Sequence, residues 1–284
     1  MTLKPLTRST TPPGAPAAIP KPLPRGILPA ILDKRRMLLC LDYDGTLSEI
    51  TARPADARPV ALARPAISAL ARHTDRIALA IISGRDLKTL AALLEPEGRV
   101  WMVGSHGIEM VDPAGRRYLS PAAKESLGDL AKVRAWMRFQ IPRRAGFVVE
   151  DKRVAIALHY RTAAPAAASI ARAKFAQFVA SECPRLRILG GKMVDEVLPR
   201  AAGGKGEAVR RILAAIGPPA PMPVYFGDDA TDEDAFLELR DEGVTVRVGA
   251  AQRSYARYRV ASPAKVVAVL GDMVAMLESA RKTK

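Results

Sequence analysis

The sequence predicts an α/β protein built on a parallel sheet, with a second α/β unit inserted between the two halves of that sheet. Three observations carry this prediction. Short apolar runs end abruptly in polar residues, helical patterns alternate with them, and a stretch of different patterning separates an early group of such runs from a late one. Apolar runs of this length are typical of parallel strands buried on both faces, and their alternation with helices indicates βαβ units.

The early group contains three apolar runs, which end at Asp42, Ser83 and Gly104. In chain order, its predicted strands and helices are residues 37–41, 59–72, 77–82, 86–94 and 100–103. The late group repeats the alternation. Its predicted elements are strands at 224–226 and 244–248, a helix from Asp232 and a final helix from about Ala264. Because the two groups share one pattern, we expect them to form one split core.

The intervening stretch predicts a smaller unit of helices and antiparallel strands. Helices are expected at residues 122–140 and 165–179, strands at 147–149 and 154–160, and a hairpin of 185–189 with 192–198 around two glycines. We therefore predict a core domain of residues 35–112 and 195–284 with a cap domain of residues 113–194 inserted into it. Residues 1–34 are basic and rich in proline, and they are predicted to form a flexible tail.

The composition favours a globular protein in a reducing compartment. The chain has 284 residues, of which 49% are hydrophobic, and no apolar run approaches the roughly 18 residues that span a bilayer. Only Cys40 and Cys183 are present, so no disulfide framework is expected and a cytoplasmic location follows. The net charge of +15 points towards nucleic acid, but the basic residues are scattered and aromatic content is only 5%, which disfavours that partner.

Acidic residues follow two of the predicted strands. In open α/β sheets, ligands bind beyond the carboxyl ends of the strands, so these acids stand where a site is expected. Two carboxylates this close either share a proton or bind a cation, and a set of hard oxygen ligands favours magnesium. The acids are Asp42 and Asp44 after the first strand, and Asp228, Asp229 and Asp232 after the late strand.

Helix capping is the alternative interpretation of part of this pattern. Thr231 and Asp234 fit a capping box, and Ser83 and Asp86 have the spacing of an N-cap. In this interpretation Asp42 and Asp44 cap a turn, but capping does not explain Asp42, Asp44 and Asp228 together. A hydroxyl beside free backbone N–H groups at a helix N-terminus also suits phosphate. Lys205, which glycines flank, is either solvated surface or a cation that reaches inward to neutralise phosphate and the first aspartate.

The segment Asp42-Tyr43-Asp44-Gly45-Thr46-Leu47 resembles the D-x-D-G-T-L motif that opens the haloacid dehalogenase superfamily of phosphohydrolases. Ser83, Lys205 and Gly227-Asp228-Asp229 resemble the later motifs, in the same order. Within the superfamily, the chain most resembles the trehalose-6-phosphate phosphatase family over about residues 36–275. The strings behind this closer resemblance are residues 83–85, 104–109, 158–161 and 227–236, with departures from the usual residues at Leu198 and Ala230.

The resemblance implies a Rossmann-like core with an α/β cap, and a magnesium-dependent phosphatase that hydrolyses trehalose 6-phosphate through an aspartyl-phosphate. It implies that Asp42 is the nucleophile, that Asp44 is the general acid and base, and that Lys205 assists catalysis. The implied phosphate ligands are Ser83, Gly84 and Lys205, and the implied metal ligands are Asp42, Asp44, Asp228 and Asp229. The implied sugar ligands are Arg85, His106, Gly107, Glu109, His159, Arg161 and Glu196.

Other functions remain open at the level of sequence. The same superfamily motifs serve other sugar phosphates, such as sucrose 6-phosphate and mannosyl-phosphoglycerate. A regulatory domain that retained the fold without catalysis is a second alternative, although such a domain has no chemical need for Asp42, Asp44, Lys205 and Asp228 together. A third is nucleic-acid binding through the basic tail. Both His106 and His159 also have an alternative role as half-buried structural histidines.

Overall fold

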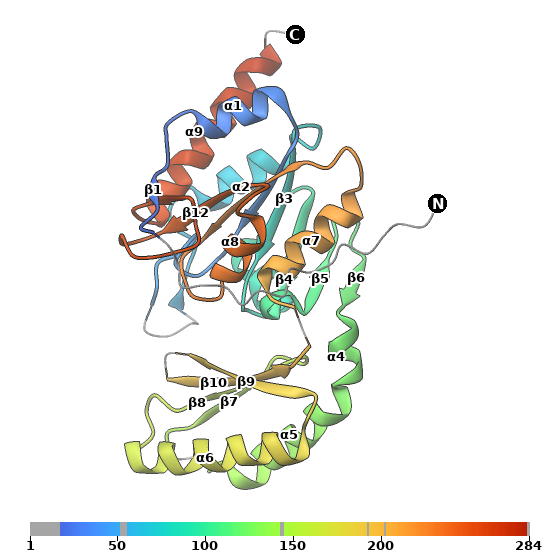
Figure 1. The fold of residues 1–284 in the computed structure, drawn as a ribbon, viewed down its shortest axis with the longest axis vertical. Coiled ribbons are helices and arrows are strands. Elements are labelled where there is room, and N and C mark those ends of the chain that lie inside the picture. The colour runs from blue at the N-terminus through green and yellow to red at the C-terminus, as the bar shows by residue number, and fades with distance from the viewer. Residues whose placement is uncertain (1–17, 52–55, 143–144, 192, 202, 283–284) are drawn as a thin grey trace.

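The computed structural model describes residues 18–51, 56–142, 145–191, 193–201 and 203–282, whose strands form two sheets (Figure 1). The larger sheet has the strand order β1-β13-β12-β11-β2-β3-β4-β5-β6 and the smaller β7-β8-β10-β9. Strands of the larger sheet are β1 Lys21–Pro22, β2 Met37–Leu41, β3 Ile77–Ile82, β4 Val100–Gly104, β5 Glu109–Val111, β6 Arg117–Leu119, β11 Met222–Gly227, β12 Val244–Val248 and β13 Tyr258–Val260. Those of the smaller sheet are β7 Val148–Asp151, β8 Ile156–His159, β9 Leu186–Gly191 and β10 Val194–Pro199.

The larger sheet is parallel from β1 to β4, and only β5 and β6 pair antiparallel. Helices cover both of its faces, which confirms the predicted α/β class. Alternate residues of β2 point to opposite faces, so Leu39 packs among the helices of one layer and Leu38 among those of the other. The first layer consists of α1 Ile27–Lys34, α2 Ala63–Ala71, α3 Leu87–Leu94 and α9 Pro263–Lys282, and the second of α7 Lys205–Ile216 and α8 Glu233–Leu239.

The smaller sheet is antiparallel throughout. Two helices, α5 Leu127–Gln140 and α6 Pro165–Glu182, lie on the face that points away from the larger sheet, and the short α4 Pro121–Glu125 leads into them (Figure 1). Trp136 of α5 stacks on Phe175 and Phe178 of α6, with ring centroids 5.6 and 5.3 Å apart. The opposite face of the smaller sheet faces the domain that contains the larger sheet (Figure 1). Among the helices of the described residues, none combines the length and hydropathy of a membrane span.

The pairing of strands β6 and β10 suggests domain boundaries that differ from both expected ones. Strand β6 pairs with β5 in the larger sheet, and β10 pairs with β8 and β9 in the smaller one. We therefore propose that the cap domain begins after Leu119 and ends at Pro199, in place of residues 113 and 194. Three-residue strands such as β6 are too short to show a periodicity in the sequence.

The N-terminal arm differs from the expected flexible tail, of which residues 1–17 lie outside the described ranges. Residues 21–22 add strand β1 to the sheet edge, and α1 packs against the core with Leu28 and Leu32 buried. Proline content led to the expectation of a tail. Pro29, however, lies in the first turn of α1, where the missing N–H has no intrahelical partner to lose.

Truncating Leu32 tests whether the arm is part of the folded core. The side chain has no exposed surface, so Leu32→Ala is expected to lower the free energy of unfolding by about 2–5 kcal/mol. Ile19→Ala is the control, because Ile19 is 58% exposed and its truncation is expected to cost within about 0.5 kcal/mol. Urea denaturation measures both. Equal, small effects would show that the arm contributes nothing to the core.

Candidate active site

The candidate site lies where three parallel strands, β11, β2 and β3, end side by side. Strand β2 pairs with β11 on one side and β3 on the other, and the N–H of Asp42 donates to Phe226 O at 2.9 Å. Asp42 therefore lies beside the end of β11, where Asp228 follows, and Ser83 follows β3. The cap covers this edge, since Lys152 Nζ of the cap is 3.4 Å from Gly84 O of the core.

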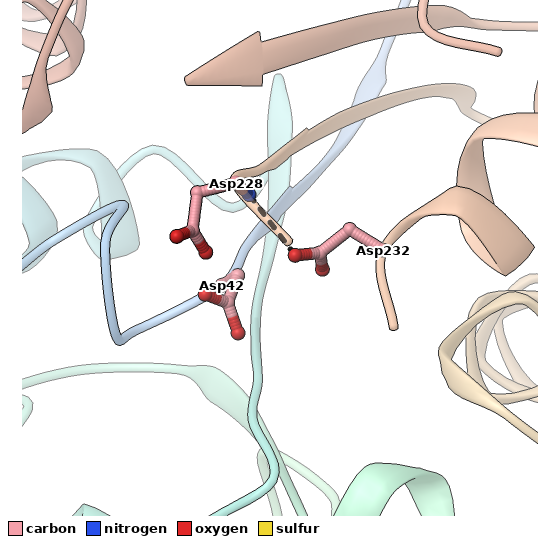
Figure 2. Close-up of side chains that lie close together, drawn as sticks. All are labelled: Asp42, Asp228 and Asp232. Atoms are coloured by element: carbon pink, nitrogen blue, oxygen red, sulfur yellow. Dashed lines mark hydrogen bonds between the residues drawn. The ribbon is translucent and has the colours of Figure 1, made fainter. Parts of the chain in front are cut away.

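Three carboxylates converge at this edge. One oxygen each from Asp42, Asp228 and Asp232 lies within 4.8 Å of the others (Figure 2). Lys205 Nζ is 2.8 Å from Asp42 Oδ1 and 2.8 Å from Asp232 Oδ1. Asp42, Asp232 and Lys205 are almost fully buried, so the interior alternative for Lys205 is the one that the structure adopts.

The acidic side chains of this cluster disfavour one another's charged forms. Burial raises the pKa of Asp228, and the neighbouring Asp232 and Asp229 raise it further, to about 7. Burial also raises the pKa of Asp42 well above its usual value, with Lys205 opposing and Asp232 and Asp228 adding to the rise. Burial lowers the pKa of Lys205, but the charges of Asp232 and Asp42 outweigh it and the net shift is upward. One ammonium thus faces three carboxylates, and a bound cation would balance the remainder.

The residues of this edge fit a divalent cation. Asp42 and Asp228 supply hard oxygen ligands of the kind that magnesium prefers. Gly45, with φ of 77°, brings the loop so close to Asp228 that a Cβ there would overlap its carboxylate. The backbone of the loop at Gly45 therefore lies next to Asp228.

Asp232 differs from the other two carboxylates in the hydrogen bonds that it accepts. Its Oδ1 accepts hydrogen bonds from Lys205 and Tyr225, and its Oδ2 from the backbone N–H groups of Asp228 and Asp229 at 3.0 and 3.1 Å. A carboxylate has about four acceptor positions, and in this residue all are used. Asp232 therefore holds its neighbours in place and has no free lone pair for a cation.

The carboxylates of Asp44 and Asp229 lie outside the three-carboxylate cluster. Arg85 donates two hydrogen bonds to Asp44, at 2.7 and 2.6 Å, and its guanidinium lies over the Tyr43 ring. Asp229 accepts from the N–H and the hydroxyl of Thr231, both at 2.7 Å. The structure thus joins Arg85 to an acid of the site, and Asp229 to a turn.

Neither expected capping motif forms. Helix α3 begins at Leu87 with Asp86 as its N-cap, and Asp86 accepts from Thr89 N–H at 2.9 Å. Ser83 stays at the end of β3, where its hydroxyl accepts from Arg85 N–H at 3.1 Å. Asp234, the second residue of the expected capping box, accepts from Gly206 N–H on α7 instead. Helix capping therefore does not explain Ser83.

A second polar cluster joins the cap to the core. Glu196 of β10 is 3.0 Å from Lys152 Nζ and 3.5 Å from His106 Nε2 of the core, while His159 of β8 is 2.9 Å from Glu150. Burial raises the pKa of Glu196, but the hydrogen bond from His106 and the charge of Lys152 outweigh it and lower the pKa to about 2. Arg161 lies exposed on the turn after β8. The structure thus places Glu196, His106 and His159 around the junction of the domains.

Sequence reasoning missed Glu150 and Lys152. The expected strand ended at residue 149, whereas β7 continues to Asp151. Residues two apart on a strand share a face, and β7 pairs Glu150 with Ala157, two residues before His159. Extending the strand by two residues would have predicted that Glu150 shares the face of His159.

Two of the expected sugar ligands, Glu109 and Gly107, make their contacts within the core domain. Glu109 is 9% exposed, and its Oε1 accepts from Leu87 N–H and Ser105 Oγ, each at 3.2 Å. Gly107 has φ of 100° and packs so closely on α7 that a Cβ would lie 2.8 Å from Gly204 O. Both residues contact the core around the turn that carries His106.

Fold and site together define the class of protein. A parallel α/β core with an inserted cap over acidic strand ends is the architecture of haloacid dehalogenase-like hydrolases. A solved protein of that description from Bacteroides thetaiotaomicron has the same fold, with a TM-score of 0.58 at 14% identity over 84% of this chain and 100% of its own.

The chain belongs to the trehalose-phosphatase family, whose model matches residues 40–264. The solved C-terminal domain of trehalose-6-phosphate phosphatase from Candida albicans is similar to it, with a TM-score of 0.74 and 25% identity over 91% of this chain and 99% of that domain. The trehalose-phosphate phosphatase of Mycobacterium marinum is 33% identical over 86% of this chain and 63% of its own length.

The chain spans only part of the curated relatives that it matches. It covers 63% of the Mycobacterium marinum protein. It also covers 19% of an uncharacterized glycosyl hydrolase of Mycobacterium tuberculosis, which is 36% identical over 89% of this chain.

Proposed function

We propose that this chain is a magnesium-dependent phosphatase that hydrolyses trehalose 6-phosphate to trehalose and inorganic phosphate. The observation that carries the proposal is the buried arrangement of Asp42, Lys205 and Asp232 at the strand ends beneath the cap. Family membership and the names of the relatives support the substrate. The two cysteines, both buried and free, support the proposal of a cytoplasmic location.

In the first step, an oxygen of the Asp42 carboxylate attacks phosphorus. The new bond is an acyl phosphate, and the bond that breaks joins phosphorus to the sugar oxygen. Asp44 gives its proton to that oxygen, and trehalose leaves as a neutral alcohol. Because Asp44 is bound to Arg85 in this structure, the proposal requires that this ion pair opens when the substrate enters.

In the second step, water attacks the phosphorus of the acyl phosphate and transfers a proton to Asp44. The bond between phosphorus and Asp42 breaks, which releases inorganic phosphate and regenerates both carboxyl groups. Ser83, the N–H of Gly84 and Lys205 bind the phosphate oxygens in both steps. Lys205 stabilises their charge from a buried position, where an ammonium acts more strongly than in water.

Magnesium, held by the carboxylates of Asp42 and Asp228 and the backbone carbonyl of Asp44, would neutralise charge on the phosphate oxygens. Asp229 is the weaker candidate ligand, since its carboxylate is engaged by Thr231. Asp232 would act indirectly by orienting the loop that carries Asp228.

The sugar is proposed to bind at the junction of cap and core. Glu196, His159 and His106 remain candidate ligands for its hydroxyl groups, and we add Glu150 and Lys152 from their contacts with this cluster. Arg161 remains a candidate at the exposed edge. Arg85 is better explained as a residue that positions Asp44. Glu109 and Gly107 are better explained as residues that position His106.

A phosphate-release assay across sugar phosphates tests the function. With magnesium present, kcat/KM for trehalose 6-phosphate is expected to exceed that for sucrose 6-phosphate, mannosyl-phosphoglycerate and glucose 6-phosphate by at least about 100-fold, because a site built to hydrogen-bond hydroxyl groups rejects ligands that leave its groups unpaired. Chelation of the metal is expected to remove the activity. A higher kcat/KM for another sugar phosphate would overturn the substrate, and no release from any would favour the regulatory alternative.

A further inference from the structure

Tyr225 lies beneath the candidate site without reaching its surface. The residue is on β11, has no exposed surface, and meets the ring of Phe236 edge-on with centroids 5.8 Å apart. Its hydroxyl donates to Asp232 Oδ1 at 2.7 Å. The ring belongs to a cluster of buried hydrophobic side chains from the sheet and from α7 and α8, and this packing holds the hydroxyl against Asp232.

The oxygen that Tyr225 contacts is the one that also holds Lys205. Lys205 Nζ is 2.8 Å from Asp232 Oδ1 and the same distance from Asp42 Oδ1. The ammonium is therefore shared between two carboxylates. A carboxylate oxygen that already accepts one hydrogen bond attracts a second donor less strongly, so the hydroxyl of Tyr225 weakens the hold of Asp232 on the ammonium.

The remaining hydrogen bonds of Asp232 fix its orientation. Its other oxygen accepts from the N–H groups of Asp228 and Asp229, and rotation of the carboxylate would break these bonds. Burial raises the pKa of Tyr225 well above its ordinary value, and the charges of Asp232 and Asp42 add to that rise. The hydroxyl thus remains a donor at neutral pH.

We propose that Tyr225 is a positioning residue for Lys205, acting through Asp232, so that the ammonium stays free to leave Asp232 for the phosphate oxygens. This inference rests on the proposed role of Lys205 in phosphoryl transfer. Without the hydroxyl, Asp232 Oδ1 retains Lys205 as its one donor and draws the ammonium away from the phosphate. The effect falls on the transition state, where the phosphate charge is greatest.

The variant Tyr225→Phe tests the proposal, because it removes one oxygen and leaves the packing intact. Loss of one hydrogen bond to a charged group predicts a fall in kcat of about tenfold with KM within about twofold. Tyr118→Phe is the control: its hydroxyl also donates to a carboxylate, Asp112 Oδ2 at 2.9 Å, but on strand β6 outside the site. We expect its kcat to stay within about twofold of the wild type.

Two further readouts separate positioning from a general loss of stability. In protein labelled with ¹⁵N-lysine, the Nζ resonance of Lys205 is expected to move in Tyr225→Phe and to stay in place in Tyr118→Phe. In the background of Asp232→Asn, adding Tyr225→Phe is expected to lower kcat no further, since both changes act through one group.

The assays use trehalose 6-phosphate and, in parallel, p-nitrophenyl phosphate. If the wild type hydrolyses only the second compound, the proposed substrate fails while the inference about Tyr225 is still tested. An unchanged kcat, an unchanged Nζ resonance in Tyr225→Phe, or additive losses in the double variant would overturn the inference. Lower thermal stability at full kcat per folded molecule would overturn it as well, because that result assigns Tyr225 to packing alone.

Discussion

Asp42→Asn is expected to lower kcat by at least about 10⁴-fold while the protein remains folded, because a neutral amide replaces the carboxylate that attacks phosphorus. The amide has the shape of the carboxylate, and its oxygen can still accept the hydrogen bond that Lys205 donates at 2.8 Å. Circular dichroism and thermal melting check the fold, and phosphate release from trehalose 6-phosphate checks the chemistry.

Asp272→Asn is the control for this variant. Asp272 is exposed on α9, and its replacement is expected to leave kcat unchanged. Release of phosphate by folded Asp42→Asn at a rate near that of the wild type would remove Asp42 from the mechanism, whichever sugar phosphate is used.

Lys205→Met is expected to lower both activity and stability. Loss of the ammonium removes the charge that stabilises the phosphate oxygens, which predicts a fall in kcat of about 10²–10³-fold. It also leaves Asp42 and Asp232 buried without their shared partner, and breaking a buried ion pair in this way costs about 3–5 kcal/mol in the free energy of unfolding. Single-turnover kinetics and urea denaturation measure the two effects.

Lys174→Met on α6 is the matched control for Lys205, because the same replacement occurs there on an exposed surface. It is expected to change the free energy of unfolding by no more than about 0.5 kcal/mol. A Lys205→Met protein as stable as this control would contradict the ion pair, and one with full kcat would contradict the catalytic role.

The core of the fold could be predicted because its signals are local. Strands β2 and β3 are continuous apolar runs, and helices such as α3 show a clear apolar period. Elements whose stability comes from distant contacts were beyond that reasoning. Strand β1, two residues long, exists only because it pairs with β13, more than 200 residues later in the chain.

The site was predictable to the extent that strand ends reveal it. Asp42, Ser83 and Asp228 each directly follow a strand, and the carboxyl ends of parallel strands lie at one edge of the sheet, so these residues are expected to converge. The contact between Lys205 and Asp42 joins residues 163 positions apart, and the residues alone left it as one of two alternatives for Lys205. The role of Asp232 depends on four donors from three segments of the chain, which no local pattern encodes.

The expected sugar ligands show where a motif stops being informative. His106 and Glu109 belong to one string of the family resemblance, residues 104–109, yet His106 meets the cap and Glu109 turns inward to Ser105 and Leu87. Left-handed backbone at Ser105 and His106, with φ of 50° and 58°, separates the two directions. Backbone conformations of this kind are rare outside glycine and are not readable from residue types.

The phosphoryl group itself provides the most direct test of the mechanism. Wild-type protein mixed with trehalose 6-phosphate is quenched within one turnover and treated with borohydride, which reduces an acyl phosphate to an alcohol, and the modified residue is then located by mass spectrometry of peptides. We predict reduction at Asp42 alone, and none in Asp42→Asn. Reduction at another carboxyl group, or rapid turnover with no trapped residue at any time point, would contradict an aspartyl-phosphate on Asp42.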